Sequence, residues 1–380
     1  MLFRVHSFIS VKSFRQSVLF GMIALTVYSC MPIQAYRYIV PDEQDVYRFK
    51  YETVKHADTC FEFKKVPVKK SFEVANWTSK VPLIKLPLDQ FLKEQKTKYF
   101  VVIKNDSILY EYTDRKIKKY NPVPSFSISK SFVSACLGIA IQQGYIGSVN
   151  DRVTDYLPEL NYHKNFESLT INHLLNQKSG IRMRVPNVAD AYYGKVENVL
   201  PYIYFDHKPG EHFEYININY TLLGLIIERT TKQDLHKYFS DNIWSKIGTC
   251  DSAVWGYDYK TKHTRAIGCF AGSARDYAKF GMLYLNNGSW KGNQLIDSNW
   301  VKQSITPVNS LGENVGYNNS WFIGEKEVGD YMALGMYRQQ IYINPENNVV
   351  IVSLMKFNKE NLDLRWWQIL RQVTEQTKSN

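Results

Sequence analysis

Runs of β-branched and aromatic residues, interrupted by short polar turns, occur in two regions of the chain. Residues 99–112 contain two such runs on either side of Asn105-Asp106, a pattern typical of a β-hairpin. Residues 339–355 repeat the pattern around the polar turn 345–348. The sequence therefore predicts strands towards both ends of its main part.

Between these hairpins, apolar residues recur at the spacing of amphipathic helices. Ser273 and Asp276 form an acidic variant of the capping box at the start of one of them. We predict an α/β fold in which an antiparallel sheet, assembled from distant segments, is flanked by helices and packs against a mostly helical subdomain, with a cleft between the two. The helices are expected at 129–143, 170–177, 218–230, 234–246, 273–287 and 359–376.

The N-terminus has the pattern of a processing signal. Residues 17–28 are an apolar run too short to span a bilayer comfortably, and Ser29-Cys30 follows in the manner of a bacterial lipobox. We predict a lipoprotein-type signal peptide at 1–29, a lipidated Cys30 and a location in the bacterial cell envelope facing the periplasm; an uncleaved membrane anchor is the alternative. An irregular lead segment at 30–95 would wrap the catalytic domain at 96–380.

Composition excludes several classes of protein. The 380 residues are 44% hydrophobic and 22% charged, which is globular rather than disordered. The net charge of +11 is scattered along the chain, so we expect no nucleic-acid partner. Zinc spacings, GxGxxG and Walker A motifs are absent from the sequence, so no metal and no cofactor are expected. Cys136 is expected in the core, and Cys250 and Cys269 could form a disulfide in an oxidising compartment.

The candidate chemistry lies in the motif Ser-x-x-Lys, which occurs twice. Ser127 and Lys130 begin a predicted helix, where positions i and i+3 share a face, so the amine can reach the hydroxyl. Ser353 and Lys356 lie in a predicted strand, where the same spacing points to opposite faces. Ser127 is therefore the candidate nucleophile, at a helix N-terminus that favours developing negative charge.

Two further segments accompany this motif in a fixed order. One is FEYIN at 213–217 with the apolar run TLLGLIIE after it, and the other is Ala333-Leu334-Gly335-Met336 before Gln339. Over roughly residues 95–357 the chain resembles the penicillin-recognising serine hydrolases (class C β-lactamases, DD-peptidases and related esterases), and most of all the branch containing 6-aminohexanoate-dimer hydrolase. The stretch 267–290 resembles a helix of that branch.

This resemblance implies an acyl-enzyme mechanism. Ser127 would attack a carbonyl, Lys130 would act as base, and Tyr215 would relay the proton to the leaving group. Asn217 would orient Lys130 or the substrate amide, unless it merely caps the following helix. The backbone N–H groups of Ser127 and, by resemblance, Met336 would form the oxyanion hole. For the other residues the alternatives are a capping Ser127, a solvated Lys130 and a core Tyr215.

The third motif departs from the resemblance. Lactamases carry Lys-Thr-Gly or His-x-Gly there, whereas this chain has neither, and Arg338 stands where the related branch has Gly. We therefore expect hydrolysis of a small ester or amide with weak or no β-lactamase activity, unless Arg338 supplies the missing cation. The alternative is a non-catalytic envelope binder, or a DD-peptidase-like binder of peptidoglycan, on the same fold.

Overall fold

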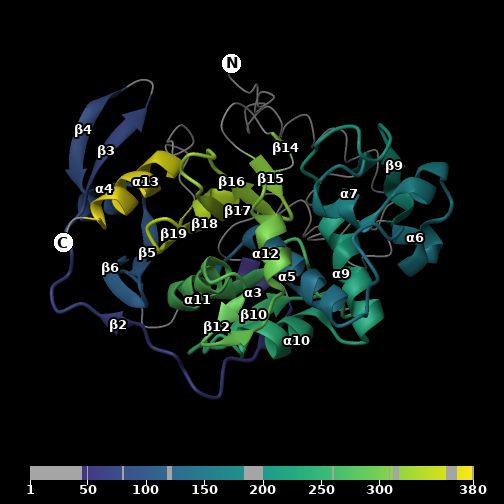
Figure 1. The fold of residues 1–380 in the computed structure, drawn as a ribbon, viewed down its shortest axis with the longest axis horizontal. Helices are drawn as coiled ribbons and strands as arrows, with labels where there is room; N and C mark the ends of the chain where they lie inside the picture. The colour runs from purple at the N-terminus through teal and green to yellow at the C-terminus, as the bar shows by residue number, and fades with distance from the viewer. Residues whose placement is uncertain are drawn as a thin grey trace, which may run out of the picture. The chain divides into compact units, whose positions relative to one another are not determined.

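The protein is built around a nine-stranded sheet with helices on both faces (Figure 1). The computed structural model describes residues 45–48, 50–78, 81–117, 122–183, 200–258, 261–307, 309–310, 316–356 and 366–378. All neighbouring strands of this sheet are antiparallel except β2, which pairs parallel to β6. In spatial order the strands are β14 (Asn309–Ser310), β15 (Gly316–Asn318), β16 (Trp321–Ile323), β17 (Tyr331–Gly335), β18 (Gln339–Asn344), β19 (Val349–Met355), β5 (Thr97–Lys104), β6 (Ser107–Thr113) and β2 (Lys64–Lys65).

The central strands are buried on both faces, and their side chains alternate between two cores. In β19, Val350 and Val352 belong to the core that contains α5 (Ile128–Gln142) and α11 (Ala274–Leu285). Val349 and Ile351 point the other way, into the core beneath α4 (Leu88–Glu94) and α13 (Trp366–Gln376). This two-residue period explains why the strand is apolar throughout rather than at alternate positions.

A smaller antiparallel sheet leads into the helix that carries Ser127. Its strand order is β1 (Tyr51–Val54), β10 (Ala253–Gly256), β11 (Phe270–Gly272) and β7 (Val123–Pro124). The N–H of Ser125 continues the ladder by donating to the carbonyl of Phe270 at 2.7 Å. The chain then turns directly into α5, so this sheet fixes where the helix begins.

The remaining elements are helices and three two-stranded antiparallel sheets. Among the described residues, no helix has both the length and the apolar character needed to cross a membrane. These small sheets are β3 (Glu73–Thr78) with β4 (Val81–Pro87), β8 (Ile181–Met183) with β9 (Ile203–Phe205), and β12 (Ser289–Trp290) with β13 (Asn293–Gln294). The other α-helices are α3 (Asp45–Arg48), α6 (Val153–Tyr156), α7 (Ile171–Leu175), α9 (Ile218–Thr231), α10 (Leu235–Phe239) and α12 (Ser298–Ser304). The 3-10 helices are η1 (Pro158–Leu160), η2 (Lys164–Ser168), η4 (Leu200–Tyr202) and η6 (Met336–Arg338), and η5 (Ser240–Trp244) is a π-helix.

The α/β prediction and both predicted hairpins are confirmed, as β5–β6 and β18–β19. The helices expected at 129–143, 218–230 and 273–287 form as α5, α9 and α11, and the Ser273 side chain caps the last by accepting from the Asp276 N–H. The helix predicted at 170–177 ends early, at Leu175. The one predicted at 234–246 divides into α10 and η5.

Two sequence predictions about the N-terminal part have different outcomes. The prediction of an irregular segment at 30–95 is wrong for its second half, where β3, β4 and α4 form and pack on the outer face of the large sheet. The reason is that Leu88, Phe91 and Leu92 complete the core beneath α13. Because α13 lies nearly 300 residues later in the chain, the local sequence pattern does not reveal this contact. The predicted signal peptide at 1–29 and the lipidated Cys30 lie outside the described residues.

The structure pairs the cysteines differently from the expectation. Cys250 forms a disulfide with Cys60, 190 residues away, so the suggested bridge between Cys250 and Cys269 is wrong. Cys269 is half-buried and takes no part in this bridge, and Cys136 is fully buried in the core as expected. Because the partner of Cys250 lies in the lead segment, only the tertiary structure could identify it.

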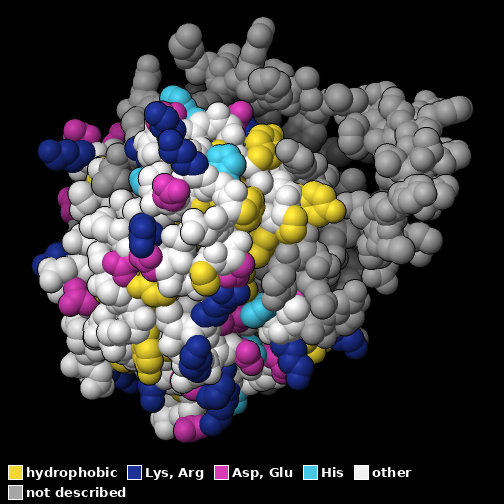
Figure 2. Space-filling model, turned by 90° about the vertical axis from the view of Figure 1, so that its right-hand side faces the viewer, with side chains coloured by type: hydrophobic (Ala, Val, Ile, Leu, Met, Phe, Trp, Pro, Cys, Tyr) yellow, Lys and Arg dark blue, Asp and Glu magenta, His cyan; other side chains and the backbone are white. Residues whose placement is uncertain are grey.

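Charges of both signs are interspersed on the surface. On the face shown in Figure 2, Lys and Arg side chains alternate with Asp and Glu rather than forming a basic stripe. Ion pairs on the surface include Arg152 with Asp155 and Arg229 with Glu159. On this face the basic side chains are scattered, as they are along the sequence.

Candidate active site

Ser127 occupies the position just before the first turn of α5. Its side chain makes no capping hydrogen bond to the helix; instead its Oγ accepts a hydrogen bond from Lys130 Nζ at 2.9 Å. The alternative that Ser127 is only a helix cap is therefore not supported by the geometry. A hydroxyl at the N-terminus of a 15-residue helix also lies where the helix dipole stabilises negative charge.

Lys130 is completely buried, which excludes the alternative of a solvated lysine. Besides Ser127, its ammonium group donates to the carbonyl oxygen of Ile267 at 3.0 Å and lies 5.1 Å from the ring centroid of Tyr215. A buried cation needs such partners because leaving water is costly. Ile267 and Tyr215 thus fix the amine at the nucleophile.

Tyr215 comes from the segment that precedes α9 and is half-buried at Ser127. Burial, together with the neighbouring Tyr317, raises the pKa of the Tyr215 phenol far above its ordinary value, while a hydrogen bond with Ser127 acts in the opposite direction. At neutral pH Tyr215 is therefore a phenol that can donate a hydrogen bond. The structure brings Ser127, Lys130 and Tyr215 together: helical spacing predicted the first pair, and the family resemblance implied Tyr215 beside them.

Asn217 stands at the N-cap position of α9, but its side chain makes no capping hydrogen bond. Its backbone is already helical there, with φ −67° and ψ −39°. The alternative of a conventional cap is therefore not supported.

The end of β17 lies directly against the backbone that leads into Ser127. A Cβ placed on Gly335 would come within 2.2 Å of the Ser125 carbonyl oxygen, so only glycine fits. Met336 follows immediately and is 42% exposed. The next two residues, Tyr337 and Arg338, both have positive φ angles (59° and 62°), which non-glycine residues rarely adopt.

No lysine or histidine stands in the third motif on β17. Ala333 is fully buried and Leu334 half-buried, so the strand presents aliphatic side chains where lactamases carry a cation. The ring of Tyr337 packs edge-on against that of Phe126, with centroids 5.3 Å apart. An aromatic pair therefore lies beside the segment that leads into Ser127.

Gln177 braces the Tyr215 segment and was not identified from sequence. Its side-chain oxygen accepts hydrogen bonds from the N–H of Ile216 at 3.0 Å and from Asn219 Nδ2 at 2.7 Å. Its carbonyl accepts from the N–H of Glu214 at 2.7 Å. A polar residue at the end of the helix predicted at 170–177 was the available signal, but nothing local linked it to a segment some forty residues away.

The second Ser-x-x-Lys motif forms no catalytic pair. Ser353 is buried within β19, and no hydrogen-bond partner for its Oγ occurs among the described residues. It shares the face of Val349 and Ile351, opposite the core of α5, while Lys356 follows the strand and is exposed. The prediction that Ser353 lies in a strand is confirmed.

A family model described as Beta-lactamase matches residues 89–374, three quarters of the chain. The chain belongs to the β-lactamase family. It has the β-lactamase/transpeptidase-like fold and is a penicillin-recognising serine hydrolase by family, as the resemblance implied. Within the described ranges, no group of three His, Cys, Asp or Glu residues could hold a metal ion.

Relatives come from several bacteria. Protein flp of Staphylococcus aureus is 28% identical over 299 residues. The match covers 68% of this chain and only 59% of the length of protein flp. The 6-aminohexanoate-dimer hydrolase of Paenarthrobacter ureafaciens is 25% identical over 316 residues, 75% of this chain and 78% of the relative. The structure of a 6-aminohexanoate-dimer hydrolase homologue from Bacillus anthracis superposes with a TM-score of 0.76 at 24% identity, covering 87% of this chain and 92% of its own.

Proposed function

We propose that the protein is a serine hydrolase that forms an acyl-enzyme on Ser127 and hydrolyses small neutral esters or amides. The observation that carries this proposal is the hydrogen bond between Lys130 Nζ and Ser127 Oγ, 2.9 Å long, at the start of α5. Nucleophile and base within hydrogen-bond reach are the signature of covalent catalysis. Membership of the β-lactamase family supports the same reaction class.

In the first step Ser127 Oγ attacks the carbonyl carbon of the substrate. Its proton passes to Lys130 when that amine is unprotonated, and the phenol of Tyr215 lies beside both groups to share it. Negative charge develops on the carbonyl oxygen. The N–H groups of Ser127 and Met336 would stabilise this charge, by about 3 kcal/mol for each donor.

The close approach of Gly335 to Ser125 supports this oxyanion hole, because it places the end of β17 beside the start of α5. Tyr215 then gives its proton to the leaving group and recovers one from Lys130. Water then loses a proton to the same pair of residues as its oxygen attacks the acyl carbon. The bond from that carbon to Ser127 Oγ breaks, the acid leaves, and Oγ takes the proton back from the pair. Asn217 would orient the substrate amide or Lys130.

The preference for neutral substrates follows from the third motif. A penicillin carries a carboxylate that Lys or His would bind in a lactamase, and Ala333 and Leu334 cannot do so. Losing one such charge-assisted contact costs about 1.5–3 kcal/mol, or about ten- to a hundredfold in affinity. Esters and short amides need only the oxyanion hole and the Ser127, Lys130 and Tyr215 side chains.

The decisive experiment compares hydrolysis of p-nitrophenyl butyrate and of nitrocefin by the wild type, Ser127→Ala and Ser353→Ala. We expect the wild type to favour the ester and Ser127→Ala to lose at least about a thousandfold in kcat. Ser353→Ala should keep wild-type turnover because Ser353 faces the opposite core. Circular dichroism verifies that each variant is folded.

Two outcomes would contradict the proposal. Wild-type turnover in folded Ser127→Ala would show that the nucleophile lies elsewhere. Nitrocefin turnover exceeding that of the ester, and falling in Arg338→Ala, would show that Arg338 replaces the missing cation and that the preference for neutral substrates is wrong.

We further propose that the mature protein is attached to the bacterial cell envelope through a lipidated Cys30. The apolar run 17–28 followed by Ser29-Cys30 supports this proposal. Two or more acyl chains are sufficient for stable attachment. After cell fractionation we expect the wild type in membranes and Cys30→Ala released from them; equal distribution of the two would exclude lipid attachment.

A further inference from the structure

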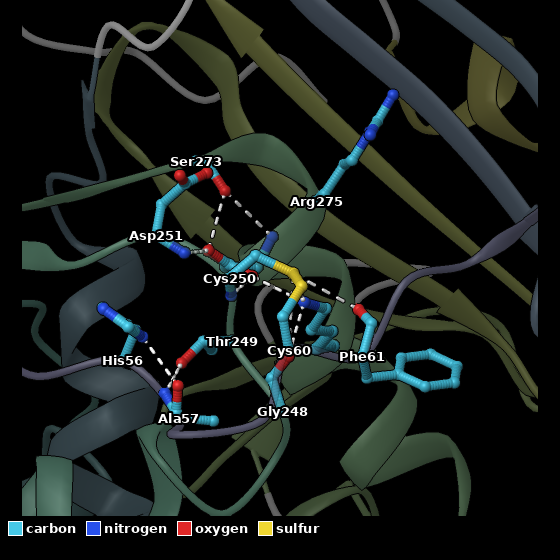
Figure 3. Close-up of polar contacts among 12 residues, drawn as sticks. His56, Ala57, Cys60, Phe61, Gly248, Thr249, Cys250, Asp251, Ser273 and Arg275 are labelled. Carbon is cyan, nitrogen blue, oxygen red and sulfur yellow. Dashed lines mark hydrogen bonds and ion pairs between the residues drawn. A yellow bond between two sulfur atoms is a disulfide. The ribbon is translucent and has the colours of Figure 1, made fainter.

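A disulfide joins Cys60, which precedes Ser127 in the chain, to Cys250, which follows it. The two segments that it connects also share backbone hydrogen bonds (Figure 3). The N–H of Phe61 donates to the Gly248 carbonyl at 2.8 Å, and the N–H of Ala57 donates to the Thr249 carbonyl at 3.2 Å. The two ends of the bridge have different surroundings. Cys60 is an exposed residue, whereas Cys250 is half-buried.

A buried lysine contacts one sulfur of this bridge. Lys279 is 1% exposed, and its Nζ lies 3.1 Å from the Sγ of Cys250. The same ammonium group donates to the Gly248 carbonyl at 2.7 Å and to Asp276 Oδ1 at 2.8 Å. These three partners account for its three hydrogens, so the ammonium is fixed with one hydrogen directed at Cys250.

Asp276 holds this arrangement together. Its carboxylate accepts from the backbone N–H groups of Cys250 at 3.0 Å and Asp251 at 3.1 Å, as well as from Lys279. Cys250 is therefore tied to α11 through its own backbone and through Lys279. If the bridge opened, the Cys250 sulfur would stay beside the cation.

We propose that the Cys60–Cys250 bridge is a thiol-exchange site, in which a small thiol attacks Cys60 and Lys279 stabilises the departing Cys250 thiolate. The incoming thiolate forms a new S–S bond with Cys60 Sγ. The Cys60–Cys250 bond breaks, and its electron pair leaves on Cys250. A second thiol then attacks the mixed disulfide, which yields the oxidised disulfide of the reagent and a Cys60 thiolate that takes a proton from water.

The direction of attack follows from access and from the leaving group. Exchange requires that the attacked sulfur be reachable, and it is faster when the departing thiolate is stabilised, as it is beside a lysine. Attack on Cys60 meets both conditions. Attack on Cys250 would require entry to the less exposed sulfur and would expel a sulfur that Lys279 does not contact.

The first test identifies the attacked sulfur in the wild-type protein. The oxidised full chain is incubated under native conditions with reduced glutathione, quenched with an alkylating reagent and mapped by mass spectrometry. We expect the glutathione adduct on Cys60 and the alkyl group on Cys250. An adduct on Cys250, or a bridge that reacts only after unfolding by denaturant, would overturn the proposal.

The second test removes the cation. Lys279→Met should slow adduct formation by about fivefold or more, because the departing thiolate loses its counter-charge. Lys291→Met is the matched control, since Lys291 lies over the ring of Phe61, 4.3 Å from its centroid, next to Cys60. Equal rates of adduct formation in folded Lys279→Met and Lys291→Met would contradict the role of Lys279. If Lys279→Met does not fold, the first test still decides the proposal, because it uses only the wild-type protein.

Discussion

At neutral pH the Tyr215 phenol keeps its proton, because burial beside Tyr317 raises its pKa far above the ordinary value. A protonated phenol next to Ser127 and Lys130 can donate to a leaving group, which an anion could not do. In the proposed mechanism the three side chains would divide the proton transfers among themselves. Lys130 would receive the proton of Ser127, and Tyr215 would give its own proton to the leaving group.

Replacing Tyr215 by phenylalanine tests this division at the scale of one oxygen atom. We expect kcat for p-nitrophenyl butyrate to fall by about a hundred- to a thousandfold in Tyr215→Phe, the size typical of a lost general acid, with little change in KM. The ring would still pack against Tyr317, so the thermal unfolding midpoint should stay close to that of the wild type.

The control is Tyr202→Phe, since Tyr202 is 49% exposed and lies on η4 rather than in the segment that carries Tyr215. It should leave both kinetic parameters unchanged. If Tyr215→Phe also kept the wild-type kcat, Lys130 alone would carry the protons.

Among the secondary-structure elements, the site depends on how closely β17 approaches the start of α5. The nucleophile lies on a helix, while the proposed second oxyanion donor, Met336, follows a strand more than two hundred residues later. Gly335 is the contact between them, because a side chain there would meet the Ser125 carbonyl. The two elements can only be this close if that position has no Cβ.

Gly335→Ala should therefore separate β17 from α5. We expect a loss of about 1–3 kcal/mol in unfolding free energy from overpacking, and at least about a tenfold loss of kcat as the oxyanion donors move apart. Urea unfolding and ester hydrolysis measure the two effects.

Gly268→Ala is the matched control. An added Cβ at Gly268 would lie 3.7 Å from Phe126, an ordinary contact, beside the same segment. It should change neither stability nor kcat appreciably. If both alanine variants behaved alike, the close approach at Gly335 would not be what positions the oxyanion hole.

For the whole molecule, buried phenols link stability to pH. Burial is the main cause that raises the pKa values of a set of tyrosines above their ordinary value of 10.0 in the folded protein. The unfolded chain releases these protons near pH 10, whereas the folded protein retains them. The residues concerned are Tyr110, Tyr215, Tyr220, Tyr284, Tyr317, Tyr331 and Tyr342.

We therefore expect these tyrosines to make their full contribution to the free energy of unfolding below about pH 10. Above that pH the contribution should fall progressively, because unfolding then releases protons. Each such tyrosine contributes a slope of up to about 1.4 kcal/mol per pH unit. Urea unfolding across this range, with tyrosinate absorbance recorded in parallel, measures the effect. Ionisation of all tyrosines near pH 10 in the still-folded protein would contradict it.

The sequence by itself determined the features that arise within one or two turns of chain. The hairpins β5–β6 and β18–β19 follow from apolar runs around polar turns, and α5 follows from its apolar residues. The contact between Lys130 and Ser127 belongs to the same class, because i and i+3 on a helix meet whatever surrounds them. The same reasoning placed Ser353 in a strand and excluded it as the nucleophile.

Only the tertiary structure decided the partners that lie far apart in sequence. The Ile267 carbonyl that holds Lys130, the Gln177 side chain that braces Tyr215, and the bridge from Cys60 to Cys250 each join distant segments. No local period encodes these pairings, since they depend on which surfaces fill the two cores and so bring remote backbone together. Local periodicity specifies each element and the face it buries, whereas packing selects the neighbour that covers that face.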